Sequence, residues 1–328
     1  MQKFLIIQSA FLGDVILMTP IVSELHRLYP EAQIDVVVRK GNESLLQNNP
    51  KIHRLIVWNK KEHKYANLWK ALRAIRQTRY DEVITLQRFT SAGVLTLFSK
   101  AKRRIGFDKN AFSWMYGITK PHSLYSGLHE VERNLSLIAH HGAAALVRPE
   151  LFPSQEDEKA VKSYKEINPV YYCLAPASVW ETKMLPAYKW IEIIKYLVTK
   201  GEVFLLGAPS DIELCKEIQS NFDAQVYNLA GKLSLLQSAA LMKDAAMNFV
   251  NDSGPLHIAS AMNAPTRAFF CSTVPSFGFG PLADNSKVIE TKLNLDCRPC
   301  GEHGFHACPL GHFKCGHSID VSPENLDI

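Results

Sequence analysis

The chain has 328 residues, 47% apolar and 21% charged, a balance that excludes a disordered or fibrous protein and, at about 100–200 residues per domain, favours two domains. The net charge of +5 is unevenly divided, since residues 1–160 carry +8, residues 161–328 carry −3, and residues 51–109 alone carry +11. No stretch approaches the roughly 18 consecutive apolar residues of a membrane-spanning helix.

Short apolar runs alternate with amphipathic segments through the first half. The predicted strands are Lys3–Gln8, Ile34–Val38, Leu55–Trp58 and Glu82–Leu86, and the predicted helices are Val15–Leu28, Glu43–Gln47 and Leu68–Thr78. The opening run looks superficially like an export signal, but Gln8 and Ser9 interrupt it, which favours a buried strand that enters a loop. Without an export signal, the expected compartment is the reducing cytoplasm.

The second half repeats this alternation. Its predicted strands are Tyr171–Ala175, Val203–Gly207, Asn248–Asn251 and Arg267–Cys271, and its predicted helices are Ala187–Thr199, Pro209–Gln219, Ser234–Lys243 and Gly254–Met262. Strands separated by helices predict βαβ units and parallel sheets. The polar segment 149–168 breaks the pattern, so we expect an α/β fold of two domains, residues 1–160 and 161–328.

The loop Ser9–Asp14 follows the first strand, and ligands of open parallel sheets bind at the carboxyl ends of strands. This loop lacks the G-x-G-x-x-G pattern of dinucleotide-binding proteins, and the Walker sequence G-K-[ST] occurs nowhere in the chain. The loop presents Asp14 at the mouth of the sheet. Its carboxylate there either caps the next helix or takes part in chemistry.

Two loops of the second half suit an anionic ligand. Segment 175–186 carries Ser178 and Lys183, whose hydroxyl and ammonium groups could bind a diphosphate, although Lys183 could equally be solvated. Segment 251–257, NDSGPLH, predicts a helix start with a Ser or Asp N-cap and free backbone N–H groups, a ready anion site. His257 would contact the same ligand or make a structural hydrogen bond.

Four segments together resemble the ADP-heptose:lipopolysaccharide heptosyltransferases of glycosyltransferase family 9. They are SAFLGDVILMTP near the start, KRRIGFD at 102–108, PASVWETKMLPAYKW at 176–190 and NDSGPLHIASA at 251–261. The resemblance implies a GT-B fold, in which two Rossmann-like domains face a cleft, with the sugar acceptor on the N-terminal domain and the nucleotide sugar on the C-terminal one. The SVWETK loop and the cysteine-containing tail are most similar to the type II enzymes, which add to an existing heptose.

The resemblance also implies a role for each matching residue. Asp14, next to Gly13, matches the catalytic base of an inverting displacement, for which orientation makes an ordinary carboxyl pKa sufficient. Ser178 and Lys183 match the positions that hold the diphosphate. The remaining donor-binding matches are Asp252, Ser253, Gly254, Leu256 and His257 at the phosphate-binding helix, with free N–H groups expected at Gly254 and Leu256, and Leu233 against adenine. No D-x-D metal motif is evident, so no cofactor is expected for catalysis.

The same resemblance implies a ligand for the basic segment 51–109, namely inner-core lipopolysaccharide with its carboxylates and phosphates. The candidate acceptor-binding residues are Gly13, Lys60, Lys61, Lys64, Lys102, Arg103 and Arg104. A solvated helix face is the alternative, particularly for Lys70, Arg73 and Arg76. The same charges could hold the protein peripherally against the anionic inner face of the inner membrane. Nucleic acid is less favoured because no recognised binding module is present.

The seven cysteines form two groups. Cys173, Cys215 and Cys271 stand singly in apolar surroundings and are expected in the core. Cys297, Cys300, Cys308 and Cys315 cluster among histidines and are a candidate structural zinc site, although their spacing matches no common zinc finger and free thiols are the alternative.

We therefore expect an inverting transferase that moves heptose from ADP-L-glycero-D-manno-heptose to the lipopolysaccharide inner core. Another family 9 transferase with a different nucleotide-sugar donor would have the same loops, and donor screening would separate the two. A nucleotide-sugar epimerase of the same fold would have no use for a basic acceptor surface. A non-catalytic nucleotide-sugar-binding protein would not need Asp14.

Overall fold

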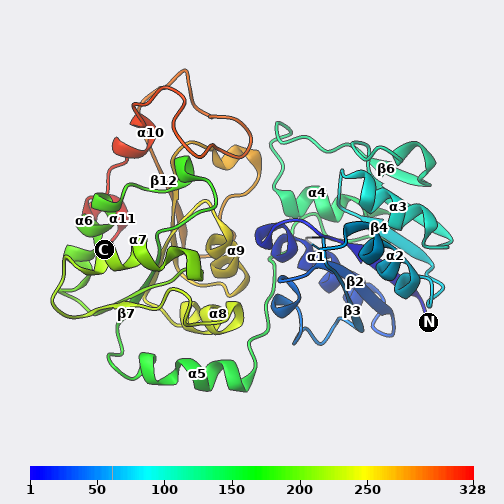
Figure 1. The fold of residues 1–328 in the computed structure, drawn as a ribbon, viewed down its shortest axis with the longest axis horizontal. Helices are drawn as coiled ribbons and strands as arrows, with labels where there is room; N and C mark the ends of the chain where they lie inside the picture. The colour runs from blue at the N-terminus through cyan, green and yellow to red at the C-terminus, as the bar shows by residue number, and fades with distance from the viewer. Residues whose placement is uncertain (61) are drawn as a thin grey trace. The chain divides into compact units, whose positions relative to one another are not determined.

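The computed structural model describes residues 1–60 and 62–328, which form two compact units, Met1–Phe152 and Pro153–Ile328 (Figure 1). The boundary precedes the expected residue 160 because helix α5 (Gln155–Lys165) belongs to the second unit. The Ser154 hydroxyl caps α5 by accepting a hydrogen bond from the Asp157 N–H at 3.1 Å, and Lys165 pairs with Asp244 at 2.6 Å. The polar stretch that resembles a linker is therefore largely a capped helix.

The first unit is built on a six-stranded parallel sheet with strand order β3-β2-β1-β4-β5-β6. Its strands are β1 (Lys3–Ile7), β2 (Gln33–Arg39), β3 (Arg54–Trp58), β4 (Glu82–Thr85), β5 (Arg103–Phe107) and β6 (Ile118–Lys120). Its helices are α1 (Leu12–Leu28), α2 (Lys64–Ile75), α3 (Thr90–Phe98) and α4 (Glu130–Ser136), with short 3-10 turns η1 (Glu43–Leu45), η2 (Ser113–Met115) and η3 (Ala139–His141). The helix predicted over Glu43–Gln47 is thus a single 3-10 turn.

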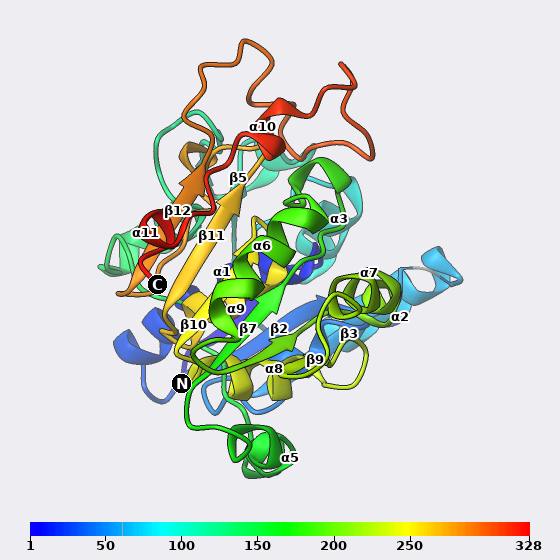
Figure 2. The same cartoon turned by 90° about the vertical axis from the view of Figure 1, so that its left-hand side faces the viewer.

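The second unit repeats this plan with strand order β12-β11-β10-β7-β8-β9 (Figure 2). Its strands are β7 (Tyr171–Ala175), β8 (Glu202–Leu205), β9 (Val226–Asn228), β10 (Met247–Asn251), β11 (Thr266–Phe270) and β12 (Ser286–Glu290). Besides α5, its helices are α6 (Ala187–Leu197), α7 (Ile212–Gln219), α8 (Leu235–Lys243), α9 (Gly254–Ala261), α10 (Lys314–His317) and α11 (Pro323–Leu326), with 3-10 turns η4 (Glu181–Lys183), η5 (Pro209–Asp211) and η6 (Pro275–Phe277). Cys173, Cys215 and Cys271 are buried, as predicted.

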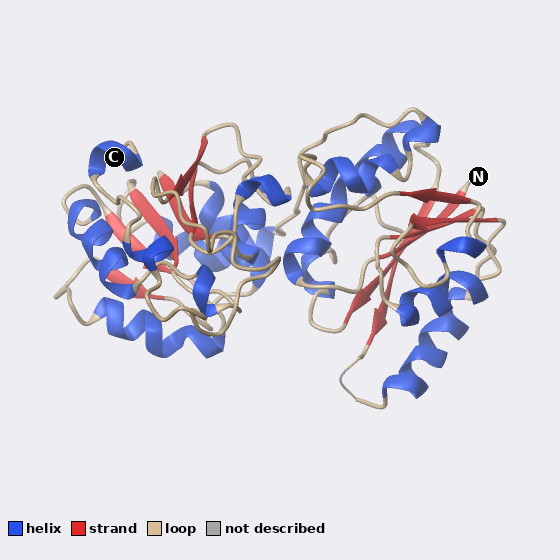
Figure 3. Ribbon diagram, turned by 90° about the horizontal axis from the view of Figure 1, so that it is seen from above, coloured by secondary structure: helices blue, strands red, loops and turns tan. Residues whose placement is uncertain are grey.

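Helices accompany the sheet in each unit, so the two parallel sheets are shielded from water as α/β folds require (Figure 3). No helix in the described parts of the chain is both long enough and apolar enough to cross a bilayer.

Each sheet reverses its strand order at a central pair of strands, β1 and β4 in the first unit and β7 and β10 in the second. Open α/β sheets bind ligands at such switch points, outside the carboxyl ends of the strands. The loop with Asp14 follows β1, the loop with Lys183 follows β7, and Asp252 follows β10. The fold therefore puts the three loops favoured by the sequence at the two switch points.

Candidate functional site

Asp14 lies in the first turn of α1, and its Oδ2 accepts a hydrogen bond from the Phe11 N–H at 3.1 Å. Burial raises the pKa of Asp14 to about 6, and the negative charge of Glu130 contributes in the same direction. The backbone N–H groups of Phe11 and Asp14 and the nearby His122 act against this rise. The expectation of an ordinary pKa is therefore wrong, and the Asp14 carboxylate has the higher proton affinity of a useful general base.

Lys60 reaches the loop that carries Asp14. Its Nζ donates a hydrogen bond to the Ser9 carbonyl oxygen at 2.8 Å and lies 4.5 Å from the ring centroid of Trp58. Burial, followed by the charges of Arg39 and Lys64, lowers the pKa of Lys60 to about 8. The structure thus brings Lys60 beside the loop that contains Gly13 and Asp14, with Lys64 near enough to influence its charge.

Two arginines at the carboxyl ends of the strands of the first sheet were not identified from the sequence. Arg39 ends β2, with its guanidinium 5.7 Å from the Phe11 ring centroid. Arg88 follows β4, with its guanidinium 5.7 Å from the ring of Phe89. Phe11 and Phe89 are 57% and 52% exposed, so cations and apolar rings share this surface. A basic residue at the end of a buried strand, or a few residues past it, was the available sequence signal.

The basic cluster at 102–104 lies elsewhere. Lys102 pairs with Asp81 at 2.7 Å and Arg103 with Glu82 at 2.8 Å, at the amino ends of β5 and β4. Because the strands are parallel, these residues lie at the amino ends of the strands, whereas Asp14 lies at the carboxyl ends. Arg104 is the next residue of β5, in the same half of that strand. The structure therefore does not bring these three residues to Asp14, and Lys61 lies outside the described residues.

Glu82 also contacts two histidines at the amino edge. Among the described residues, Glu82, His140 and His141 are the one group of metal-ligating side chains whose ligand atoms lie within 4.8 Å of one another. His141 Nε2 lies 2.8 Å from Glu82 Oε2, while Arg103 holds Oε1. The group offers the donor types of a metal site, but the fixed charge of Arg103 opposes a cation there.

Lys183 and Asp252 meet at the switch point of the second sheet. The Lys183 Nζ lies 2.6 Å from Asp252 Oδ2, and the Thr273 hydroxyl donates to the same oxygen at 2.6 Å. Asp252 is only 5% exposed. The carboxylate thus holds an ammonium group near the start of α9, where an anionic ligand would compete for the ammonium.

Asn251, which sequence reasoning missed, ties the two loops at this switch point together. Its Nδ2 donates to the Pro176 carbonyl oxygen at 2.8 Å, and its Oδ1 accepts from the Leu185 N–H at 3.0 Å. One buried side chain at the end of β10 therefore fixes both ends of the loop that carries Ser178 and Lys183. An amide at the last position of a buried strand was its sequence signal.

The start of α9 differs in detail from the expectation. Ser253 occupies the N-cap position, but its hydroxyl lies 3.4 Å from the Asn251 carbonyl oxygen and caps no N–H. The Leu256 N–H donates to the Ser253 carbonyl at 3.1 Å, so the prediction of a free Leu256 N–H is wrong. Within the described residues, the Gly254 N–H has no hydrogen-bond partner, which leaves it for a ligand. His257 is buried, with its ring 6.3 Å from that of Phe279.

Ser178 follows β7 and Leu233 follows β9, two strands of the second sheet that are separated by β8. The half-buried Ser178 accepts a hydrogen bond from the Trp180 N–H at 3.4 Å. Leu233 precedes Ser234, the N-cap of α8, and is partly exposed. Both side chains therefore remain accessible to a ligand bound outside the carboxyl ends of β7 and β9.

The four clustered cysteines line one cavity of about 20 Å³, together with Thr182, Ser272 and His312; they are Cys297, Cys300, Cys308 and Cys315. In the described parts of the chain, no three of their sulfur atoms lie within 4.8 Å of one another. The Thr182 N–H donates to the Phe305 carbonyl at 3.0 Å, and the Cys300 N–H donates to the Ser272 carbonyl at 2.8 Å. The segment 297–315 is thus attached directly to the turn that ends in Lys183.

The sequence and the fold of the chain are similar to those of known proteins. The family sequence model of glycosyltransferase family 9 (heptosyltransferase) matches residues 68–306 of the chain. Lipopolysaccharide heptosyltransferase 3 of Escherichia coli is 29% identical over 279 residues, 80% of this chain and 82% of the relative. Lipopolysaccharide heptosyltransferase 2 of Escherichia coli K12 is 26% identical over 351 aligned residues, 99% and 96% of the two chains. The solved structure of E. coli ADP-heptose lipopolysaccharide heptosyltransferase II has the same fold, with a TM-score of 0.78, 23% identity and coverage of 92% and 96%.

Proposed function

The chain belongs to glycosyltransferase family 9 and is a glycosyltransferase, and we propose that it transfers heptose from ADP-L-glycero-D-manno-heptose to the inner core of lipopolysaccharide. The relatives named heptosyltransferase 2 and 3 support the reaction, and the resemblance of the SVWETK loop favours transfer to an existing heptose. The observation that carries the proposal is the Lys183–Asp252 pair beside the start of α9, since it offers a cation and a free Gly254 N–H to a diphosphate.

The second unit is proposed to bind the donor. The diphosphate draws the ammonium of Lys183 away from Asp252, while the Gly254 N–H and the Ser178 hydroxyl donate hydrogen bonds to phosphate oxygens. Asp252 is then free to accept hydrogen bonds from sugar hydroxyls, and Leu233 packs against adenine. The negative charge of the departing ADP is stabilised by Lys183 and the first turn of α9, where the helix dipole favours anions.

The first unit is proposed to bind the sugar acceptor. Asp14 removes the proton of the attacking acceptor hydroxyl. The hydroxyl oxygen bonds to the anomeric carbon as the bond from that carbon to ADP breaks, which inverts the anomeric configuration. Lys60, Arg39 and Arg88 are suited to the carboxylates and phosphates of the inner core. The exposed rings of Phe11 and Phe89 offer apolar surface to the faces of sugar rings.

The decisive experiment is a transfer assay with ADP-heptose and truncated lipopolysaccharide acceptors. We expect a heptosylated acceptor and free ADP from the native protein. Release or epimerisation of the sugar with donor alone would instead identify the epimerase, and donor binding without turnover on any acceptor would identify a binding protein. Preferential turnover with another nucleotide sugar would leave the assignment to family 9 intact and would contradict ADP-heptose as the donor.

No metal has a part in the proposed transfer, but the cysteine cavity supports a structural zinc ion. Thiolates are good zinc ligands, and all four cysteines line one cavity beside the Lys183 turn, although their sulfur atoms would have to move closer together. We expect one zinc per chain in purified protein and loss of the metal in Cys300→Ser, with Cys215→Ser as a matched control. A metal-free, fully active protein would overturn this assignment.

The exposed face of α2 supports peripheral attachment to an anionic membrane. Tyr65 and Trp69, one turn apart, are 74% and 61% exposed, and no acidic residue occurs between Lys64 and Arg79. Such a helix suits the boundary between lipid headgroups and water. Binding to vesicles that contain anionic lipid should fall in Trp69→Ala, whereas equal binding to neutral vesicles would exclude the electrostatic part.

A further inference from the structure

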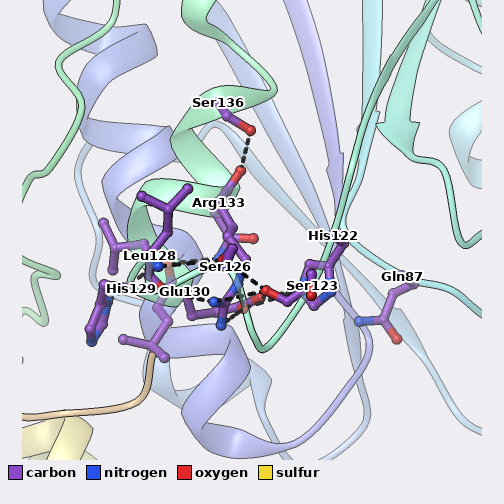
Figure 4. Close-up of polar contacts among 12 residues, drawn as sticks. Gln87, His122, Ser123, Ser126, Leu128, His129, Glu130, Arg133 and Ser136 are labelled. Carbon is purple, nitrogen blue, oxygen red and sulfur yellow. Dashed lines mark hydrogen bonds and ion pairs between the residues drawn. The ribbon is translucent and has the colours of Figure 1, made fainter. Parts of the chain in front are cut away.

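A buried charged cluster lies at the start of α4, outside the roles proposed above. Glu130 is 6% exposed and Arg133 only 2% exposed. The Arg133 Nε donates to Glu130 Oε2 at 2.8 Å, and the His122 Nε2 lies 3.2 Å from the same oxygen (Figure 4). Removing such charges from water offsets most of what their pairing contributes, so stability alone does not explain the cluster.

The register of α1 and α4 places this cluster level with Asp14. Both helices begin at the carboxyl edge of the first sheet and run back to its amino edge. Midway, the Asn134 side chain donates to the Leu17 carbonyl oxygen at 3.2 Å. At the far end, the Tyr29 hydroxyl and His141 Nδ1, just beyond the two helices, lie 2.9 Å apart. The first turns, with Asp14 on α1 and Glu130 on α4, therefore lie side by side.

The charged and hydrogen-bonding groups around the two carboxylates come from four segments of the first unit. Glu130 on α4 raises the pKa of Asp14, after the larger effect of burial, and His122 from the preceding loop lowers it. The N–H of Phe11, the residue before α1, also lowers the pKa of Asp14, and Lys60, which follows β3, contacts the loop before α1. Although burial raises the pKa of Glu130, its contacts with His122 and Arg133 hold that pKa below its usual range.

We propose that Glu130, fixed by Arg133 and His122, is a positioning residue whose negative charge keeps Asp14 receptive to the proton of the attacking hydroxyl. The inference depends on the role proposed for Asp14 as the base. In the transfer step, the hydroxyl proton moves to Asp14, the oxygen bonds to the anomeric carbon, and ADP leaves with the electron pair of the broken bond. Glu130 exchanges no proton and acts only through its charge.

The test begins with a direct titration of Asp14 in the free protein. Carbon NMR of protein labelled at the aspartate carboxyl carbon reports each titration, and Asp14→Asn identifies the signal of Asp14. Glu130→Gln should lower its midpoint by about one pH unit, because a nearby like charge is removed. His122→Gln should raise the midpoint, because an opposing charge is removed. If Glu130 and His122 had only structural roles, the two substitutions would not shift the Asp14 midpoint in opposite directions.

Glu132→Gln is the matched control, since Glu132 lies on the same helix and its Oε2 accepts from the His129 N–H at 2.7 Å. Its titration midpoint for Asp14 should equal that of the native protein, and Glu130→Asp should restore the native midpoint at least partly. If Glu130→Gln fails to fold, His122→Gln alone decides, because an unchanged or lowered midpoint in that variant overturns the inference. An unchanged midpoint in folded Glu130→Gln overturns it too.

Transfer kinetics then separate this inference from the proposed function. The acid limb of the kcat/KM profile should move with the Asp14 midpoint, downward in Glu130→Gln and upward in His122→Gln. Opposite shifts of the NMR midpoint without any movement of the kinetic limb would uphold the influence of Glu130 and contradict Asp14 as the base.

Discussion

Asp14 and Asp252 both lie at the switch point of a parallel sheet, Asp14 in the first turn of the helix after β1 and Asp252 directly after β10, yet their surroundings are electrically opposite. Burial, with a smaller contribution from the nearby Glu130 carboxylate, raises the pKa of Asp14 to about 6. Asp252 is 2.6 Å from the ammonium of Lys183. The same architecture thus supplies a carboxylate with increased proton affinity in one unit and a carboxylate that holds a cation in the other. Burial and neighbouring charges, more than topology, determine what each carboxylate can do.

The largest effect is expected from Asp14→Asn, which removes the proposed base from the first unit. Turnover should fall by about 10²–10⁴-fold, the usual contribution of general base catalysis. ADP binding should be unchanged, and thermal stability at pH 7.5 should not fall, because the amide avoids burying a charge. Steady-state kinetics, calorimetric ADP titration and thermal melts measure the three quantities. Near-normal turnover would contradict the assignment.

Lys183→Ala removes the cation from the second unit. Affinity for ADP should fall by about 10–100-fold, because a hydrogen-bonded charge is lost and Asp252 is left buried without its ammonium partner. The double variant Lys183→Ala/Asp252→Asn should recover part of this loss, since it also removes the repulsion between Asp252 and the diphosphate. Calorimetry with ADP measures both variants, and native affinity in Lys183→Ala would refute the role of this side chain.

The pH dependence of the native protein distinguishes the two carboxylates further. Asp14 acts in its deprotonated form, and its pKa is raised to about 6, so kcat/KM should decline below that pH, by about tenfold per unit once protonation dominates. ADP binding, which does not use Asp14, should not follow the same curve. Parallel loss of ADP binding and kcat/KM around pH 6 would assign the titration to the donor side instead.

The smallest effects contrast the two edges of the first sheet. Lys60→Ala should raise the KM for the lipopolysaccharide acceptor about three- to tenfold, as expected for loss of one partly buried charged contact. Lys102→Ala should change it less than about twofold, because Lys102 is 76% exposed and paired with Asp81 at the opposite edge. Equal effects of the two substitutions would mean that net charge, rather than placement, governs acceptor binding.

The sequence predicts the parallel α/β plan well, because the central strands are short, apolar and separated by amphipathic helices. It does not predict β5, which begins with Arg103 and Arg104, or the short outer strands β6 and β9, because little apolar periodicity marks them. The chemistry of Asp14, Lys183 and the α9 start is readable from motifs. The influence of Glu130 on Asp14 is not, since it depends on the packing of two helices more than 100 residues apart in the chain.

Parallel strands also govern how the first unit would capture a diffusing anion. At the amino edge, Lys102 and Arg103 are neutralised by Asp81 and Glu82, so their field is short-ranged. Across the described residues, Arg39, Lys60 and Arg88 form no ion pair with a carboxylate, and these cations lie at the carboxyl edge. These three cations add to the field at the carboxyl ends of the strands, so capture of a negatively charged glycolipid there should be fast in dilute salt and should slow steeply as dissolved ions screen them.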